Sequence, residues 1–192
     1  MRIVAASVLV ILASTSAYAD DGKGASFDLG YVRSRVGVTD STALDADQVR
    51  FGIRIGAGKH FHFGAEVDNG RITGEITQTR TIARTVGGEQ QPGYIGPLGG
   101  NSLNLKAYAG LHAVHRSFMF GGDAALGVRD TWVESDLGMD VAGFKKQPVI
   151  EMRARAEFFL SRAMTVGAVA STDMLDRRNV SLAAVFSLNF IE

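Results

Sequence analysis

The chain has 192 residues with 20 basic and 20 acidic side chains, so its formal net charge is zero. The chain therefore has no excess of positive charge that would indicate a nucleic-acid partner. Cysteine is absent, which excludes disulfides, thiolate chemistry and cysteine-based metal sites. After the first twenty residues, no apolar run approaches the ~18 residues of a membrane-spanning helix. If the chain enters a membrane, it must therefore cross it as strands.

Residues 1–19 have the pattern of a secretory signal peptide. Arg2 supplies a positive start, the stretch from Ile3 to Ala13 is apolar, and Ala17-Tyr18-Ala19 is a small-x-small cleavage site. The apolar stretch is too short to span ~30 Å of hydrocarbon as a helix. We expect an exported chain whose mature domain covers residues 20–192.

Eight segments of this domain alternate apolar and polar residues, the pattern of strands with two unlike faces. Phe51 and Ile53, for example, alternate with Gly52 and Arg54. No segment has a convincing helical period. We expect an all-β chain with strands near residues 25–34, 49–57, 61–68, 102–114, 118–129, 149–159, 164–172 and 179–190.

The connections between these strands alternate in length. Short turns are expected near residues 58–60, 115–117 and 161–163. Longer loops are expected over residues 37–46, 69–101, 130–148 and 173–178. In an up-and-down meander, this order puts all short turns at one end, which is typical of outer-membrane barrels.

The hairpin of residues 49–68 also predicts its own register. A three-residue loop keeps apolar residues on one face, with Ile55 opposite Phe63. Arg50 then lies opposite Asp68, and Glu66 lies diagonal to both Arg50 and Arg54. These placements suit salt bridges.

The polar faces of the strands carry six basic and six acidic residues. An enclosed interior needs this balance, because an unpaired buried charge costs several kcal/mol. Arginine holds five of the six basic positions, which suits bidentate pairing in a confined space. We expect the apolar faces to meet lipid and the charges to fill the lumen. The predicted lumen residues are Asp28, Arg50, Arg54, Glu66, Asp68, Lys106, Asp123, Arg129, Glu151, Arg153, Arg155 and Glu157.

The signal peptide, the eight alternating strands, the short turns and the closing strand VSLAAVFSLNF resemble the small OmpA/OmpX-like outer-membrane barrel family. The resemblance implies an eight-stranded antiparallel up-and-down transmembrane β-barrel in a Gram-negative outer membrane. In that family an aromatic residue at the end of the last strand is read by the barrel assembly machinery. Phe190 matches this position, followed here by Ile191 and Glu192.

Two further features point to partners. Arg33 and Arg35 continue the outward parity of the first strand at its loop end, where they could pair with lipopolysaccharide phosphates. The loop over residues 69–101 begins with a threonine-rich, partly alternating stretch. This stretch could form an exposed ribbon to which an extracellular partner adds a strand.

An enzymatic role has one weak signal. His115-Arg116-Ser117 resembles the His-x-Ser motif of outer-membrane lipid A deacylases, but Phe118 stands where that family has asparagine. Four scattered histidines contain no HExxH-like pair, so we predict no metal, no cofactor and no catalytic residues.

We expect a structural or surface-interaction role, through adhesion, lipopolysaccharide or another partner. The alternatives are a narrow porin-like channel, a lipid A-modifying enzyme and a soluble lipocalin-like secreted barrel.

Overall fold

The computed structural model describes residues 23–39, 42–74, 84–86, 89–91, 98–135 and 140–190. The predicted signal peptide lies outside these residues and stays a prediction. In the described part of the chain, no helix has the length and apolar character to cross a membrane. The strands are β1 (Lys23–Thr39), β2 (Thr42–Ala57), β3 (Phe61–Gly74), β4 (Arg84–Val86), β5 (Glu89–Gln91), β6 (Leu98–His115), β7 (Phe118–Ser135), β8 (Asp140–Ser161), β9 (Met164–Asp173) and β10 (Val180–Phe190).

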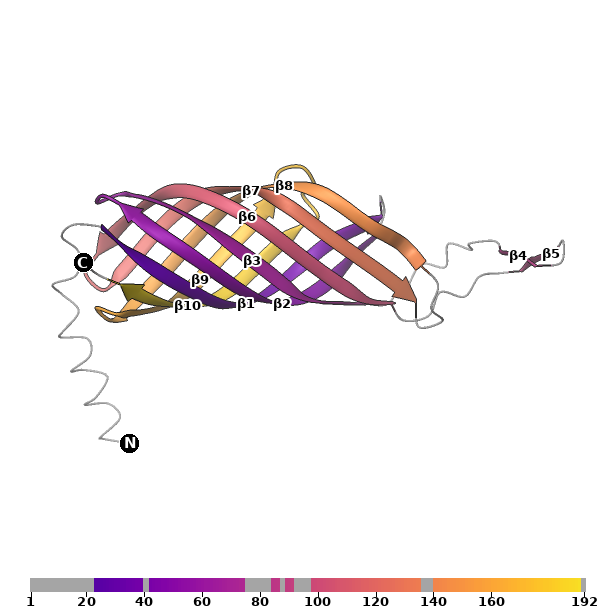
Figure 1. Cartoon of the computed structure of the whole chain (residues 1–192), viewed down its shortest axis with the longest axis horizontal. Coiled ribbons are helices and arrows are strands. Elements are labelled where there is room, and N and C mark those ends of the chain that lie inside the picture. Colours follow the sequence, from indigo (N-terminus) through magenta and orange to yellow (C-terminus); the bar gives the residue numbers. More distant parts are fainter. Residues whose placement is uncertain are drawn as a thin grey trace, which may run out of the picture.

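Eight of these strands close into a barrel in the order β1-β10-β9-β8-β7-β6-β3-β2, with antiparallel neighbours (Figure 1). β4 and β5 form a separate two-stranded sheet. Strand pairing followed once round the barrel from Ala113 of β6 returns to Leu103 of the same strand. This stagger tilts the strands by about 40° from the barrel axis. The predicted all-β, eight-stranded up-and-down barrel is confirmed.

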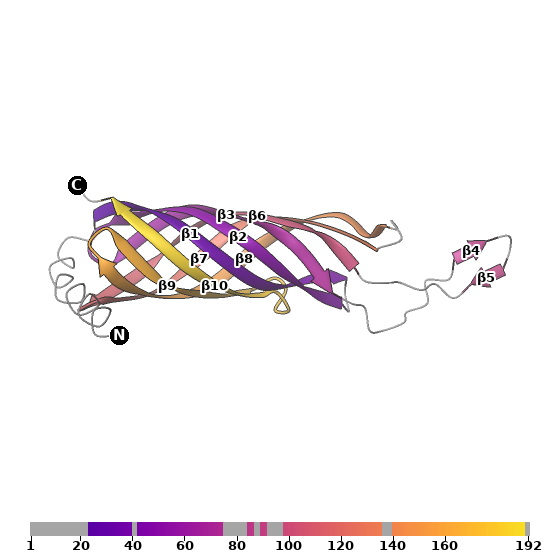
Figure 2. The same ribbon diagram turned by 90° about the horizontal axis from the view of Figure 1, so that it is seen from below.

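Three tight turns lie at the end of the barrel where β1 begins and β10 ends (Figure 2). Residues 58–60 join β2 to β3, residues 116–117 join β6 to β7, and residues 162–163 join β8 to β9. Gly58, with a φ of 98°, supplies a left-handed conformation that the first turn needs. The predicted hairpin register is also confirmed, because Ile55 pairs with Phe63.

The predicted long loops over residues 37–46 and 130–148 are wrong. β1 and β2 leave only residues 40–41 between them, and β7 and β8 leave only residues 136–139. β3 and β6 likewise take up both ends of the segment 69–101. The strands therefore extend farther at the loop end than the alternation of apolar residues indicates.

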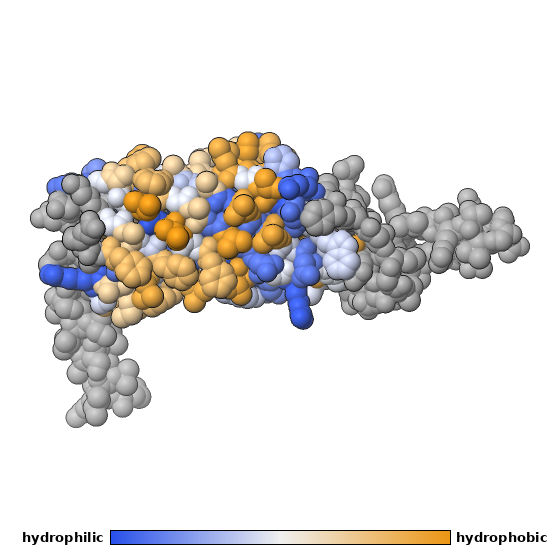
Figure 3. Space-filling view, viewed as in Figure 1, coloured by the Kyte–Doolittle hydropathy of each residue, from blue (hydrophilic) through white to orange (hydrophobic). Residues whose placement is uncertain are grey.

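An apolar belt surrounds the barrel between the tight turns and these extensions (Figure 3). On β7 it runs from Phe118 to Val128, which corresponds to about 25 Å of height at ~3.3 Å per residue and the tilt given above. Its large members include Phe27, Leu29, Tyr31, Phe51, Ile53, Phe63, Leu105, Leu111, Phe120, Leu126, Met152, Val166, Leu182 and Leu188. Six barrel strands, β1, β2, β3, β6, β7 and β8, continue beyond the belt at the loop end. The first outward residue beyond the belt on each of them is polar: Arg33, Asp47, Asn69, Asn101, Asp130 and Lys146.

Above the belt, the polarity of the wall is reversed. Outward residues such as Arg71 are polar, and several inward residues are apolar. The residues still alternate there, but apolar side chains face inward and polar side chains face outward. A strand traced by the outward apolar residues of the belt is therefore predicted to end too early. The inward apolar residues form what we call the upper core: Val36, Leu44, Ala46, Ile72 and Val133, each at most 4% exposed.

Candidate functional site

The structure places all twelve predicted lumen charges inside the barrel, each at most 7% exposed. They come from β1, β2, β3, β6, β7 and β8, whose inward positions carry them. Together with Asp173, described below, they form one connected set of ion pairs, which we call the lumen network.

Near the tight turns, Glu157 of β8 accepts hydrogen bonds from two guanidinium groups. Arg54 donates to its two carboxylate oxygens at 2.6 and 3.1 Å, and Arg155 donates to it at 2.6 Å. Asp28 of β1 lies 3.7 Å from Arg54 and 3.2 Å from Arg155. Thr165 of β9 donates to Glu157 at 2.8 Å. This cluster connects four strands across the lumen.

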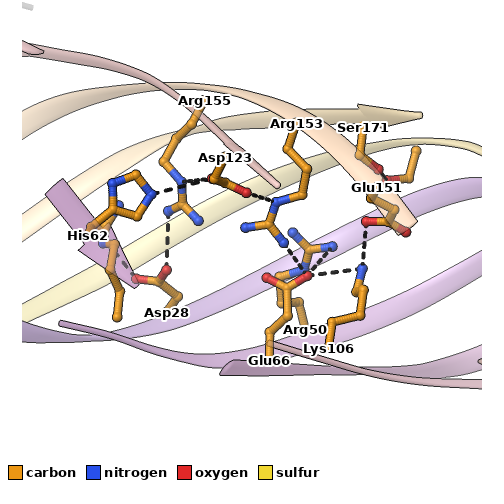
Figure 4. A network of polar contacts seen from close by, with 12 residues as sticks. Asp28, Arg50, His62, Glu66, Lys106, Asp123, Glu151, Arg153, Arg155 and Ser171 are labelled. Carbon is orange, nitrogen blue, oxygen red and sulfur yellow. Dashed lines mark hydrogen bonds and ion pairs between the residues drawn. The ribbon is translucent and has the colours of Figure 1, made fainter. Parts of the chain in front are cut away.

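Arg153 continues the network into the middle of the lumen (Figure 4). Its guanidinium contacts Asp123 and lies 2.6 Å from Glu66. Asp123 in turn lies 3.9 Å from Arg155. The guanidinium carbon of Arg153 is also 4.3 Å from the centre of the Tyr108 ring, a cation–π contact. Two carboxylates and an aromatic face thus hold this arginine.

Three carboxylates meet at Lys106. Its Nζ lies 3.0 Å from Glu66, 2.9 Å from Asp68 and 3.1 Å from Glu151. Arg50 holds two of the same carboxylates, at 3.2 Å from Glu66 and 2.7 Å from Asp68. The carboxylates here share their cations, so the loss of one cation affects several partners.

Asp173 is a lumen carboxylate that the sequence prediction missed. Arg129 lies 3.5 Å from both Asp173 and Glu151, and Asn179 donates to Asp173 at 3.2 Å. The predicted strand ends one residue too early, at residue 172. Asp173 nevertheless has the same parity on β9 as the buried Val169, and this parity could have identified it.

One predicted ion pair is wrong. Arg50 does contact both Glu66 and Asp68, as the hairpin register suggests. Arg54, in contrast, does not pair with Glu66 but reaches Glu157 and Asp28. The reason is that barrel closure brings β8 opposite β2, which a single hairpin cannot reveal.

Two histidines lie beside the network at the tight-turn end. His62 Nδ1 is 3.2 Å from His112 Nδ1, and His62 Nε2 is 3.5 Å from Asp123 Oδ2. A single proton between the two Nδ1 atoms satisfies the first contact. Among the described residues, no group of three or more histidine, aspartate or glutamate side chains is arranged to hold a metal ion.

Gly64 makes room for the Tyr108 ring, with which it is directly paired across β3 and β6. A Cβ at Gly64 would lie 2.6 Å from the Tyr108 hydroxyl oxygen and would collide with the Ile53 carbonyl oxygen. Gly64→Ala should therefore lower the free energy of unfolding by about 1–3 kcal/mol, measured by urea titration in lipid. Gly122→Ala is the control, because a Cβ there has 3.4 Å to its nearest neighbour. Equal costs at both positions would contradict this account.

Arg33 and Arg35 point outward from β1 where the apolar belt ends, and both are exposed. The Arg33 guanidinium lies 3.5 Å from the Asp45 carboxylate of β2. Tyr31, the last belt residue of β1, donates a hydrogen bond to Asp47 at 2.5 Å. The two arginines thus belong to a charged outer rim directly above the belt.

The remaining predicted features lie at the two ends of the barrel. His115 ends β6 and Arg116 lies in the following turn, both exposed at the tight-turn end. Phe190 ends β10, where it pairs with Ala25 and is exposed; its role in assembly stays a prediction. Of the segment 69–101, the structure describes its two ends, in β3 and β6, and the hairpin of β4 and β5.

Comparisons with known proteins concern the fold. No protein-family model matches the chain, and no curated protein matches it in sequence. A solved structure of Ail, the attachment invasion locus protein of Yersinia pestis, in complex with the heparin analogue sucrose octasulfate, matches with 16% identity and a TM-score of 0.56. The match covers 88% of this chain and 99% of Ail. Neisserial surface protein A matches with 10% identity and a TM-score of 0.56, over 88% of this chain and 97% of its own.

The chain has the fold of small outer-membrane β-barrels. At these identities the likeness is one of fold alone. The resemblance that the strand pattern indicated is confirmed at this level.

Proposed function

We propose that this protein is an integral barrel of the outer membrane of a Gram-negative bacterium. The observation that carries the proposal is the distribution of polarity, with the apolar belt outside and the lumen network inside. A belt about 25 Å high matches the ~25 Å apolar band of outer-membrane barrels. A soluble lipocalin-like barrel has the reverse arrangement, because its apolar faces must line the interior.

Cell fractionation tests this proposal. We expect the protein in the outer-membrane fraction, where detergent but not salt releases it. An unboiled sample should migrate faster in a denaturing gel than a boiled one, because the closed barrel resists the detergent. Recovery from periplasm or medium without detergent, or a mobility that boiling does not change, would count against the proposal.

The role of the barrel is structural or interactive rather than catalytic. Six strands rise beyond the belt and enclose the upper core, so the protein offers a folded surface outside the membrane. Ail has the same fold and is named as an attachment and invasion protein, which supports an adhesive role here. The alternative of a lipid A-modifying enzyme has less support, because His115, Arg116 and Ser117 lie at the tight-turn end.

Arg33 and Arg35 support a contact with lipopolysaccharide. They are exposed at the height where the belt ends, which is the headgroup level of the outer leaflet. Guanidinium groups bind phosphate oxygens in bidentate fashion. Ail binds a polysulfated ligand, which shows that a barrel of this fold can hold a polyanion.

Replacing both arginines, as Arg33→Ala and Arg35→Ala, should weaken the retention of lipopolysaccharide. Each charge near an anionic lipid surface contributes about 1 kcal/mol, so we expect the loss of two charges to make retention roughly thirtyfold weaker. Lipopolysaccharide that copurifies with the protein can be measured by mass spectrometry. The control is Arg116→Ala with Arg162→Ala, which removes two exposed arginines from the opposite end. Equal loss in both double variants would contradict the proposed site.

A narrow porin-like channel has less support than the interactive role. The lumen network occupies the interior, and the upper core lies above it. We therefore expect no single-channel conductance in planar bilayers. Reproducible current steps from the purified protein would favour the channel instead.

A further inference from the structure

Three of the four histidines of the chain lie together at the tight-turn end of the lumen. His62 has the inward parity of β3, His60 has the same parity in the turn before it, and His112 has the inward parity of β6. The backbone joins the two strands at this point, because His112 N donates to the His60 carbonyl oxygen at 2.8 Å. The fourth histidine, His115, has the opposite parity on β6 and is exposed.

Ring nitrogens of His62 and His112 are as far apart as two nitrogens that bind one metal ion. The two Nδ1 atoms are separated by 3.2 Å. Two nitrogens at ~2.0–2.1 Å from a tetrahedral Zn²⁺ are about 3.3–3.4 Å apart. A cation can therefore replace the proton between them with little change in this separation. The His112 proton then moves from Nδ1 to Nε2, so both rings stay neutral.

Asp123 holds His62 in the orientation that a metal ligand needs (Figure 4). Its Oδ2 lies 3.5 Å from His62 Nε2, so we assign the proton of this ring to Nε2 and a free lone pair to Nδ1. Metal-binding histidines usually donate their second N–H to a carboxylate or carbonyl, which fixes the tautomer and the ring. The Asp123 carboxylate is itself held by the Arg153 guanidinium.

The charge of the lumen network also favours an added cation. Its twelve predicted members balance at six of each sign, and Asp173 adds a seventh carboxylate. With neutral histidines, the described network therefore has one negative charge in excess. Buried charge is costly unless it is compensated, so a cation inside the barrel improves the balance.

The histidine pair is accessible from the tight-turn end of the barrel. His112 is half-buried, whereas His62 lies deeper and is 2% exposed. Gly56 pairs with His62 and Gly121 pairs with His112 on the neighbouring strands. Both glycines are half-buried and have no side chain that would cover the rings. An ion can therefore reach the two nitrogens through the end of the lumen.

We propose that His62 and His112 bind one divalent transition-metal ion at the tight-turn end of the lumen. Imidazole nitrogen suits Zn²⁺ and Cu²⁺, whereas Mg²⁺ and Ca²⁺ prefer oxygen ligands. In the described part of the chain, no third histidine, aspartate or glutamate side chain is in place, so water completes the coordination. This site goes beyond the proposed function, which gives the histidines no role.

Cu²⁺ tests the site, because its electron paramagnetic resonance spectrum reports the nitrogens that bind it. The protein is purified in detergent without a histidine tag and titrated with Cu²⁺ alone. We expect one bound ion per chain, with two equatorial nitrogens. Disturbing only the carboxylate partner of a metal-bound histidine usually weakens binding 10–100-fold, so His62→Ala and His112→Ala should each weaken it at least roughly tenfold.

His115→Ala is the matched control, because it removes an exposed histidine from the same end of β6. It should leave the Cu²⁺ affinity and the spectrum unchanged. Zn²⁺ should raise the urea midpoint of the unaltered protein and of His115→Ala but not of His112→Ala, because an ion that binds only the folded state stabilises it.

Heat-modifiable gel mobility shows whether each variant is folded, so failure of the metal site is separable from failure of the barrel proposal. If His62→Ala, at the more buried position, does not fold, His112→Ala decides alone. No binding to the unaltered protein, unchanged binding in His112→Ala, or an equal loss in His115→Ala would overturn the proposal. The last result would mean that Cu²⁺ binds adventitiously to surface histidines.

Discussion

Replacing Lys106 with methionine should lower the free energy of unfolding by about 3–5 kcal/mol. Methionine fills a similar volume but leaves Glu66, Asp68 and Glu151 without the ammonium that lies about 3 Å from each of them. All three carboxylates are buried, so water cannot replace the lost partner. Urea titration of the barrel in lipid vesicles, followed by tryptophan fluorescence, measures the change. Trp132, the single tryptophan, provides the signal.

The matched control adds Glu66→Gln to Lys106→Met. This double variant removes one positive and one negative charge, so the network regains its original net charge and part of the stability should return. A loss below about 1 kcal/mol in Lys106→Met would contradict a buried network and fit a solvated surface charge.

Arginine in place of Leu29 should lower the free energy of unfolding by about 2–4 kcal/mol in a bilayer. Leu29 faces outward in the middle of the apolar belt, so a charge there meets hydrocarbon. Asn101→Arg is the control, because Asn101 faces outward on β6 above the belt. We expect a cost near 0–1 kcal/mol at this position. The same unfolding measurement applies to both variants, and a Leu29→Arg cost as small as that of the control would mean that the belt does not face lipid.

The barrel and the parity of its lumen were predictable, because a strand has a side-chain period of two. Once Arg50 and Phe51 are assigned to opposite faces, the face of every other residue in that strand is known. The extensions above the belt were not predictable in the same way. Val36 and Leu44 face inward and Arg33 faces outward, so the same alternation has the opposite meaning outside the membrane. No local feature of the sequence marks the point along each strand at which its surroundings change from lipid to water.

Ion-pair partners were predictable only within a hairpin. Arg50 and Asp68 are opposite each other because one turn sets their register. Arg54 and Glu157 are 103 residues apart, and their contact depends on how all eight strands are staggered on closure. Long side chains can also reach several partners of opposite charge. Arg54, for example, pairs with Glu157 rather than with Glu66. The polar faces of the strands could therefore predict that lumen charges of both signs nearly balance, with Asp173 as the one acidic residue missed, but not which of them pair.

In the proposed outer-membrane barrel, the apolar faces of the strands meet lipid and the charged faces meet one another. The chain has no cysteine, so a spin label can be attached at a single introduced residue. Leu126→Cys places the label in the belt, where the native leucine is 61% exposed, and Arg71→Cys places it above. In bilayers, we predict that the label at residue 126 collides more with membrane-dissolved oxygen than with a water-soluble nickel chelate, and that the label at residue 71 does the reverse. Equal access of the nickel chelate to both labels would contradict the account.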